Sequence, residues 1–209
     1  GVSLGGPVTL TASAAGFSDG TVNVTVTNAL VSLGSLPTIR LGQSVSLPVS
    51  PTAPAPAGGL TVSFVSSDPS VATITASVFI AAGQTVPAAN PQVLGVNIGS
   101  AQIRASAAGF APDARTANVQ VNVTFTPTFL TVPQTTSQDI TVNVSAPAPA
   151  GGLTLALATA NTAVATVTSP ATIPQGQLTA TASVAGLAIG NTTLQATGSG
   201  VISATATIN

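Results

Sequence analysis

The chain has 209 residues, of which 44% are hydrophobic, and it carries only three basic and four acidic residues, for a net charge of −1. A typical soluble domain has about a quarter charged residues, and a chain so poor in charge lacks the basic surface that nucleic acids and anionic membranes require. No apolar run approaches the roughly 20 residues of a membrane-spanning helix. We therefore expect no nucleic-acid partner and no membrane insertion. Regularly spaced Val, Ile and Leu also favour a folded chain over a disordered one.

A tandem repeat organises the sequence. The segment APAPAGGLT at 53–61 recurs unchanged at 146–154, 93 positions later. Identity of this length marks a repeated structural unit. It predicts three parts: 1–27 as the last two strands of an incomplete repeat, 28–121 as a complete repeat, and 122–209 as a second complete repeat.

The first part, 1–27, has the pattern of a β-hairpin. Val8, Leu10 and Ala12 alternate with Thr and Ser, and Val22, Val24 and Val26 alternate with Thr and Asn. Such alternation around a Gly- and Asp-containing turn predicts two half-buried antiparallel strands. The segment AAGF at 14–17 returns at 107–110, and GVSLG at 1–5 matches GVNIG at 95–99. Either these strands belong to a longer array, or another subunit completes them by strand donation.

The first complete repeat consists of short predicted strands separated by turn signals. They are expected at 29–33, 38–41, 44–50, 60–64, 71–75, 79–80, 85–96, 102–106 and 117–123. The second repeat follows the same order, with Leu153, Leu155 and Leu157 in place of Leu60, Val62 and Phe64. Short strands without any helical period predict a β-sandwich. No flexible linker separates the repeats, so we expect a stiff rod of end-to-end domains.

Three segments of the first repeat resemble the bacterial Ig-like repeats of intimin/invasin-type adhesins and of other long exported surface proteins. They are GQSV at 42–45, SSDPSVATI at 66–74 and GSAQIRA at 99–105. The second repeat departs from this pattern at ANTA (160–163) and NTTL (191–194). The resemblance implies tandem immunoglobulin-like β-sandwich domains, an extracellular or cell-surface location, and a spacer or adhesive role. It supplies no catalytic residues.

The residue types present do not favour catalysis. His, Cys, Lys, Glu and Tyr are all absent from the sequence, and the four Asp residues lie in separate segments. We therefore expect no enzyme, no cofactor and no metal site. Asp68, before Pro69, is expected to form a turn. Asp19 and Asp113 are expected at solvated hairpin tips.

Four Asn residues begin an Asn-x-Ser/Thr sequence and are candidate glycosylation sites: Asn23, Asn122, Asn143 and Asn191. A chain this rich in Asn, Ser and Thr also produces such sequences by composition alone. The alternation of the strands places Asn23 and Asn143 on outward faces.

The strand edges have almost no charged residues to prevent edge-to-edge pairing. Proline, turns and bulges could protect them, but we expect them to be covered by neighbouring chains or by glycans. The preferred hypothesis is an extracellular structural protein, a segment of a surface filament, sheath or stalk that self-associates. The alternatives are an adhesin or glycan-binding module, and a passive spacer in a large exported enzyme. Six Phe with no Trp or Tyr argue against an aromatic sugar-binding platform.

Overall fold

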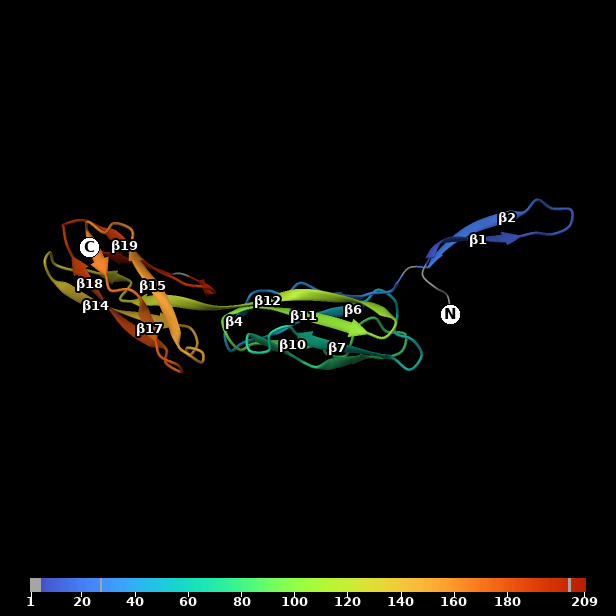
Figure 1. Ribbon diagram of the computed structural model, residues 1–209, viewed down its shortest axis with the longest axis horizontal. Coiled ribbons are helices and arrows are strands. Elements are labelled where there is room, and N and C mark those ends of the chain that lie inside the picture. The colour runs from blue at the N-terminus through green and yellow to red at the C-terminus, as the bar shows by residue number, and fades with distance from the viewer. Residues whose placement is uncertain (1–4, 27, 203) are drawn as a thin grey trace.

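The computed structural model describes residues 5–26, 28–202 and 204–209, and these residues form strands, turns and loops without a helix (Figure 1). They build two β-sandwiches with separate hydrophobic cores, together with an N-terminal hairpin. The predicted all-β, immunoglobulin-like fold is confirmed. Residues 1–4 and Thr27, which belong to the first predicted part, lie outside the described residues, as does Ser203.

The first sandwich has two facing sheets. One sheet holds, in spatial order, β9 (Ser77–Ile80), β7 (Leu60–Ser66), β11 (Gly99–Ala107), β12 (Phe110–Thr126) and β4 (Ile39–Arg40). The facing strands are β8 (Ala72–Ile74), β10 (Gln92–Gly95) and β5 (Ser44–Ser46), with β3 (Val31–Leu33) paired to β6 (Val49–Pro51). Inward side chains alternate as predicted: Leu60, Val62 and Phe64 are all buried.

The second sandwich repeats this arrangement. One sheet holds β17 (Ala171–Ile173), β15 (Leu153–Thr159), β19 (Thr192–Thr197), β21 (Thr205–Ile208) and β13 (Phe129–Leu130). The other holds β16 (Ala165–Val167), β18 (Thr179–Gly186), β14 (Ser137–Val144) and the end of β12. In both sandwiches a short early strand crosses over to run parallel to the last strand, β4 beside β12 and β13 beside β21.

Two predicted strands of the first repeat are shorter than expected. The 85–96 segment forms a strand only over Gln92–Gly95, and the 44–50 segment is divided into β5 and β6 on either side of Pro48. Proline lacks the amide proton that a strand ladder needs, and Pro87 and Pro91 lie in the part of 85–96 that is not strand. The equivalent β18 contains no proline and is eight residues long.

The identical APAPAGGLT segment forms the same turn in both sandwiches, and its central alanine, Ala55 or Ala148, is buried. The Ala55 amide donates to Gln84 O at 2.8 Å, and Ala148 donates to Gln177 O at 2.9 Å. Two consecutive glycines follow, and all four have positive φ, between +79° and +96°. Only glycine adopts this conformation without strain. The sequence identity thus preserves a backbone geometry.

Strand β12 belongs to both sandwiches. Its first part pairs with β11, and its last part, Val123–Thr126, pairs with β14. Ala117 and Val119 are buried in the first core, whereas Val121, Val123 and Phe125 are buried in the second. The alternation of side chains runs unbroken through the boundary. The last strand of one repeat is therefore the first strand of the next.

The N-terminal hairpin consists of β1 (Gly5–Ala12) and β2 (Gly20–Val26). Among the described residues, these two strands pair only with each other. Figure 1 shows the hairpin as a two-stranded ribbon apart from both sandwiches.

Candidate functional site

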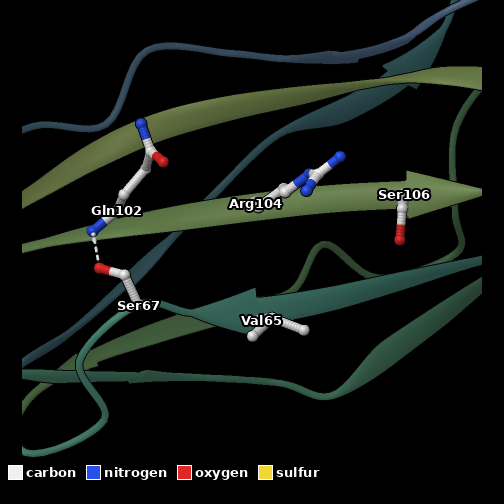
Figure 2. A pocket seen from close by; sticks show the side chains of 5 residues that line it. All are labelled: Val65, Ser67, Gln102, Arg104 and Ser106. Atoms are coloured by element: carbon white, nitrogen blue, oxygen red, sulfur yellow. Dashed lines mark hydrogen bonds between the residues drawn. The ribbon is translucent and has the colours of Figure 1, made fainter.

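A shallow groove lies on the outer face of the first sandwich, between β7 and β11 (Figure 2). It has a volume of about 420 Å³ and is lined by Val65, Ser67, Gln102, Arg104 and Ser106. The Val65 side chain is 64% exposed, and it lies opposite Arg104 in the strand ladder. The groove therefore combines one apolar side chain, one cation and several groups that can form hydrogen bonds.

Arg104 has no acidic partner among the described residues, unlike Arg115, which pairs with Asp113. A free guanidinium can donate two parallel hydrogen bonds to a carboxylate or sulfate. In the second sandwich Gln195 lies opposite Ala158 at the equivalent ladder position. The charged groove is thus specific to the first repeat. Its lining residues can donate and accept hydrogen bonds and can neutralise an anionic group.

Asp113 and Arg115 form a polar clamp at the edge of the first core. Asp113 Oδ2 accepts a hydrogen bond from the Leu33 amide at 2.9 Å, and the Arg115 guanidinium donates to the carbonyls of Leu33 and Gly34. The two side chains also pair with each other at 2.8 Å. They satisfy the backbone where the chain leaves β3 and crosses to the other sheet.

This clamp differs from what the sequence predicted for Asp113, because the residue lies within β12 and not at a solvated hairpin tip. Its side chain is only 23% exposed. A signal was present in the sequence, since Asp113 and Arg115 continue the alternating face of Ala117 and Val119. Charged residues at core-facing positions of a strand usually have bonding partners.

The clamp also sets the ionisation of Asp113. Partial burial by itself raises the pKa of Asp113, but hydrogen bonds from the amides of Leu33 and Ala114 and from Arg115 outweigh it, so the pKa lies below its ordinary value of 3.8. The Arg115 charge acts in the same direction. The carboxylate form is therefore the one that the fold stabilises.

Asp68 forms the predicted turn before β8. The hydroxyl and amide of Ser70 both donate to Asp68 Oδ1, at 2.6 and 3.0 Å, and they lower the pKa of this carboxyl. Asn161 forms the equivalent turn in the second repeat, where its Oδ1 accepts a hydrogen bond from the Ala163 amide at 3.1 Å. The second repeat thus keeps this turn, although its residues at 160–163 differ from those at 67–70 of the first repeat.

Of the four candidate glycosylation sites, Asn122 and Asn143 lie near each other on the paired strands β12 and β14, and the four sites differ in accessibility. Asn191 is exposed in a turn, and Asn23 is exposed on β2, where its Oδ1 accepts from Thr9 Oγ1 at 2.7 Å. Asn122 is half-buried, and its Oδ1 accepts from Arg40. Asn143 is also half-buried, and its amide nitrogen donates to Thr126 Oγ1 at 3.0 Å. Asn191 and Asn23 are the better candidates because their side chains are exposed.

The junction between the sandwiches is closely packed. Ile98 contacts both hydrophobic cores. The Val121 amide donates to Gly200 O at 3.0 Å, and β20 (Val201–Ile202) runs parallel to β12 beside it. The hydrogen bond from Arg40 to Asn122 also crosses the boundary. Strand, core and polar contacts thus all link the two units.

The described part of the chain has no cluster of three or more His, Cys, Asp or Glu that could hold a metal ion. None of the described residues form a helix long and apolar enough to cross a membrane.

Comparison with solved structures gives several similar folds. Domains 4 and 5 of the S-layer protein SbsC are 19% identical, with a TM-score of 0.35, over 71% of this chain and 75% of that one. The Yersinia pseudotuberculosis adhesin InvE is 20% identical, with a TM-score of 0.39, over 87% and 59%. The D0–D1 domain of intimin is 12% identical, with a TM-score of 0.33, over 88% and 95%. At such identities the likeness concerns the fold alone. No protein-family model matches the sequence, and neither does any curated protein.

Proposed function

We propose that this chain is a non-enzymatic structural segment of an extracellular element, such as a filament, sheath or stalk, in which immunoglobulin-like sandwiches are joined in series as a stiff rod. The observation that carries the proposal is the shared strand β12. It replaces a linker by a continuous ladder that pairs with β11 on one side of the boundary and with β14 on the other.

The stiffness follows from the contacts at this boundary. A bend at Gln120 would break the hydrogen bond between Val121 and Gly200 and separate Ile98 from one of its two cores. Units joined by flexible linkers lose no such contacts when they reorient. The relative orientation of the two sandwiches is therefore fixed by the same interactions that stabilise each core.

The proposal includes self-association between copies of the chain through strand edges that carry no charge. We expect these copies to meet end to end more readily than side by side. The outermost strands of the sandwiches are short: β4 and β13 have two residues, β8, β16 and β17 have three, and β9 has four. Short edge strands offer few free backbone groups to a neighbour. They protect the sides of the sandwiches in a chain that has almost no charge for this purpose.

A spin-label experiment tests the rod. The chain has no cysteine, so Ala89→Cys and Gln175→Cys introduce one label into each sandwich. We expect a narrow distribution of label distances, because β12 fixes the two units. The control carries an insertion of about six Gly/Ser residues after Gln120, which makes the junction a flexible coil. A native distribution as broad as that of the control would contradict the proposal.

The Arg104 groove supports a second candidate function, the binding of an acidic glycan. An unpaired guanidinium flanked by Ser67 and Ser106 could bind a sugar carboxylate or sulfate. We expect retention of the chain on an immobilised uronic-acid polysaccharide, and loss of that retention in Arg104→Gln, which introduces the residue found at the equivalent position, Gln195. Equal retention of both proteins would exclude this groove.

A further inference from the structure

The N-terminal hairpin has the strand register of the last two strands of a sandwich. Val8 lies opposite Val24 and Leu10 opposite Val22. At the equivalent positions of β11 and β12, Ala101 lies opposite Ala117 and Ile103 opposite Arg115. Each of these four hairpin residues is 93 positions before its counterpart. The hairpin and the β11–β12 pair are thus equivalent elements of successive repeats.

The two elements differ in what covers them. Ala101 and Ile103 are buried, at 2% and 0% exposure, whereas Val8 and Leu10 are 57% and 55% exposed. Val22 and Val24 lie on the same side of the hairpin and are also exposed. These four residues, Val8, Leu10, Val22 and Val24, are called the hairpin face. The opposite side carries Thr and Asn, as an outer face of a sandwich does.

Face-to-face packing of two hairpins does not account for the hairpin face. Two strands of this length cover roughly 300 Å², and two copies would bury about 600 Å², whereas stable interfaces bury about 1,200–2,000 Å². The sandwiches of a second copy offer no acceptor either, because strands β11 and β12, and likewise β19 and β21, already fill the equivalent positions. The occupant must lack its own last two strands.

We propose that the hairpin face closes a third sandwich, and that its occupant is a strand set of the β3–β10 type joined to the N-terminal side of β1 in the same polypeptide. The order of strands supports this source. The first part of β12 closes the first sandwich and its last part opens the second, and β2 and β3 follow one another at the equivalent positions one repeat earlier. The occupant also supplies a neighbour for the free edge of β1, since β11 pairs with β7 on that side.

The proposal adds a third unit to the rod, and it rests on the repeat architecture and not on the stiffness of the junction. A graft tests it. Because Gly1 corresponds in sequence to Gly95, residues 28–94 can be placed directly before Gly1 of the whole chain. Amide hydrogen exchange of β1 and β2 is then compared in the 209-residue and extended proteins. We expect about 100-fold slower exchange or more in the extended protein.

Two variants of the extended protein control for non-specific effects. Leu10→Lys, on the hairpin face, should remove the protection, and Thr11→Lys, on the opposite side, should retain it. A second extended protein carries residues 120–185, from the second repeat, directly before Gly1. It tests the proposal independently if the first graft fails to fold.

Unprotected hairpin amides in both grafts would overturn the proposal. So would protection of the 209-residue chain that rises with its concentration in parallel with dimer formation, since a second copy would then be the occupant. Neither result alters the spin-label distances across β12, so failure of this proposal is distinguishable from failure of the proposed rod.

Discussion

Asp113 and Arg115 show how individual charged residues contribute to the first sandwich. Their side chains bind the backbone at Leu33 and Gly34, where the chain crosses from one sheet to the other. The second sandwich reaches the same topology with alanine at the equivalent positions, Ala204 and Ala206. The turn residue Asp68 is likewise replaced by the uncharged Asn161. The two sandwiches therefore share a fold but differ in the charged groups that stabilise it.

The lowered pKa values of Asp113 and Asp68 predict that acid destabilises the first sandwich before the second. A carboxyl whose pKa is lower in the folded state stabilises the fold above its ordinary value of 3.8, and this contribution is lost as the pH falls through the lowered folded value. Unfolding of the two cores, followed by hydrogen exchange between pH 2 and pH 7, should show the first core opening earlier. Earlier opening of the second core would contradict this assignment.

The variant Asp113→Asn isolates the clamp. It should lower the unfolding free energy of the first sandwich by about 1–2 kcal/mol at neutral pH, because charge-assisted hydrogen bonds are replaced by weaker ones. The variant should also make the unfolding free energy of the first sandwich depend less on pH in the acid range. Asp19→Asn is the matched control, because Asp19 is exposed and forms no hydrogen bond with another described residue, and we expect no change in either measurement. If the unfolding free energy of Asp113→Asn depended on pH as strongly as that of the native chain, groups other than Asp113 would cause the acid sensitivity.

At the scale of single elements, the repeated turn at 146–154 depends on two glycines that differ in their surroundings. Gly151 and Gly152 both have positive φ, at +88° and +79°. A Cβ added at Gly151 would meet open space, whereas one at Gly152 would lie 2.8 Å from Ile173 O. Backbone strain therefore applies to both positions, but steric conflict with β17 applies only to the second.

We accordingly predict that Gly151→Ala costs about 1–2 kcal/mol of unfolding free energy, from the left-handed conformation alone. Gly152→Ala should cost more, because the turn must move away from β17 as well. Urea unfolding of the two variants measures this difference. Equal losses would mean that the turn adjusts without strain to the added methyl group.

At the scale of the whole molecule, the junction depends on close contact at Gly200. A Cβ on Gly200 would lie 2.2 Å from Ile98 Cγ2, and Ile98 contacts both cores. We predict that Gly200→Ala broadens the spin-label distance distribution between the sandwiches. Gly109→Ala is the matched control, because its φ is also positive, at +78°, but its surroundings are open. It should cost about 1–2 kcal/mol without broadening. Broadening in both variants would indicate general destabilisation.

Much of this architecture could be predicted from the sequence because it depends on local alternation. The period of two predicted the inward face of β7, and the repeat predicted that the second sandwich copies the first. The clamp at Asp113 could not be predicted in the same way, since its partner Leu33 is 80 residues away. Pro87 and Pro91 explain why the 85–96 strand is shorter than expected. Neither proline has an amide proton for the strand ladder, and this loss outweighs the β-propensity of the neighbouring residues. The Arg104 groove depends on which outer-face residues lie opposite one another, which only the strand register determines.

The shared strand also restricts how the repeat can change in evolution. Residues on β12 alternate between the core and solvent from Ala117 to Phe125, through both sandwiches. One residue inserted after Gln120 would turn Val121, Val123 and Phe125 outward and place Asn122 and Thr124 in the second core. Two inserted residues would restore every side chain to its own face. An odd number of inserted or deleted residues at this boundary therefore reverses the facing of every later side chain of the strand, whereas an even number keeps each side chain on its own face.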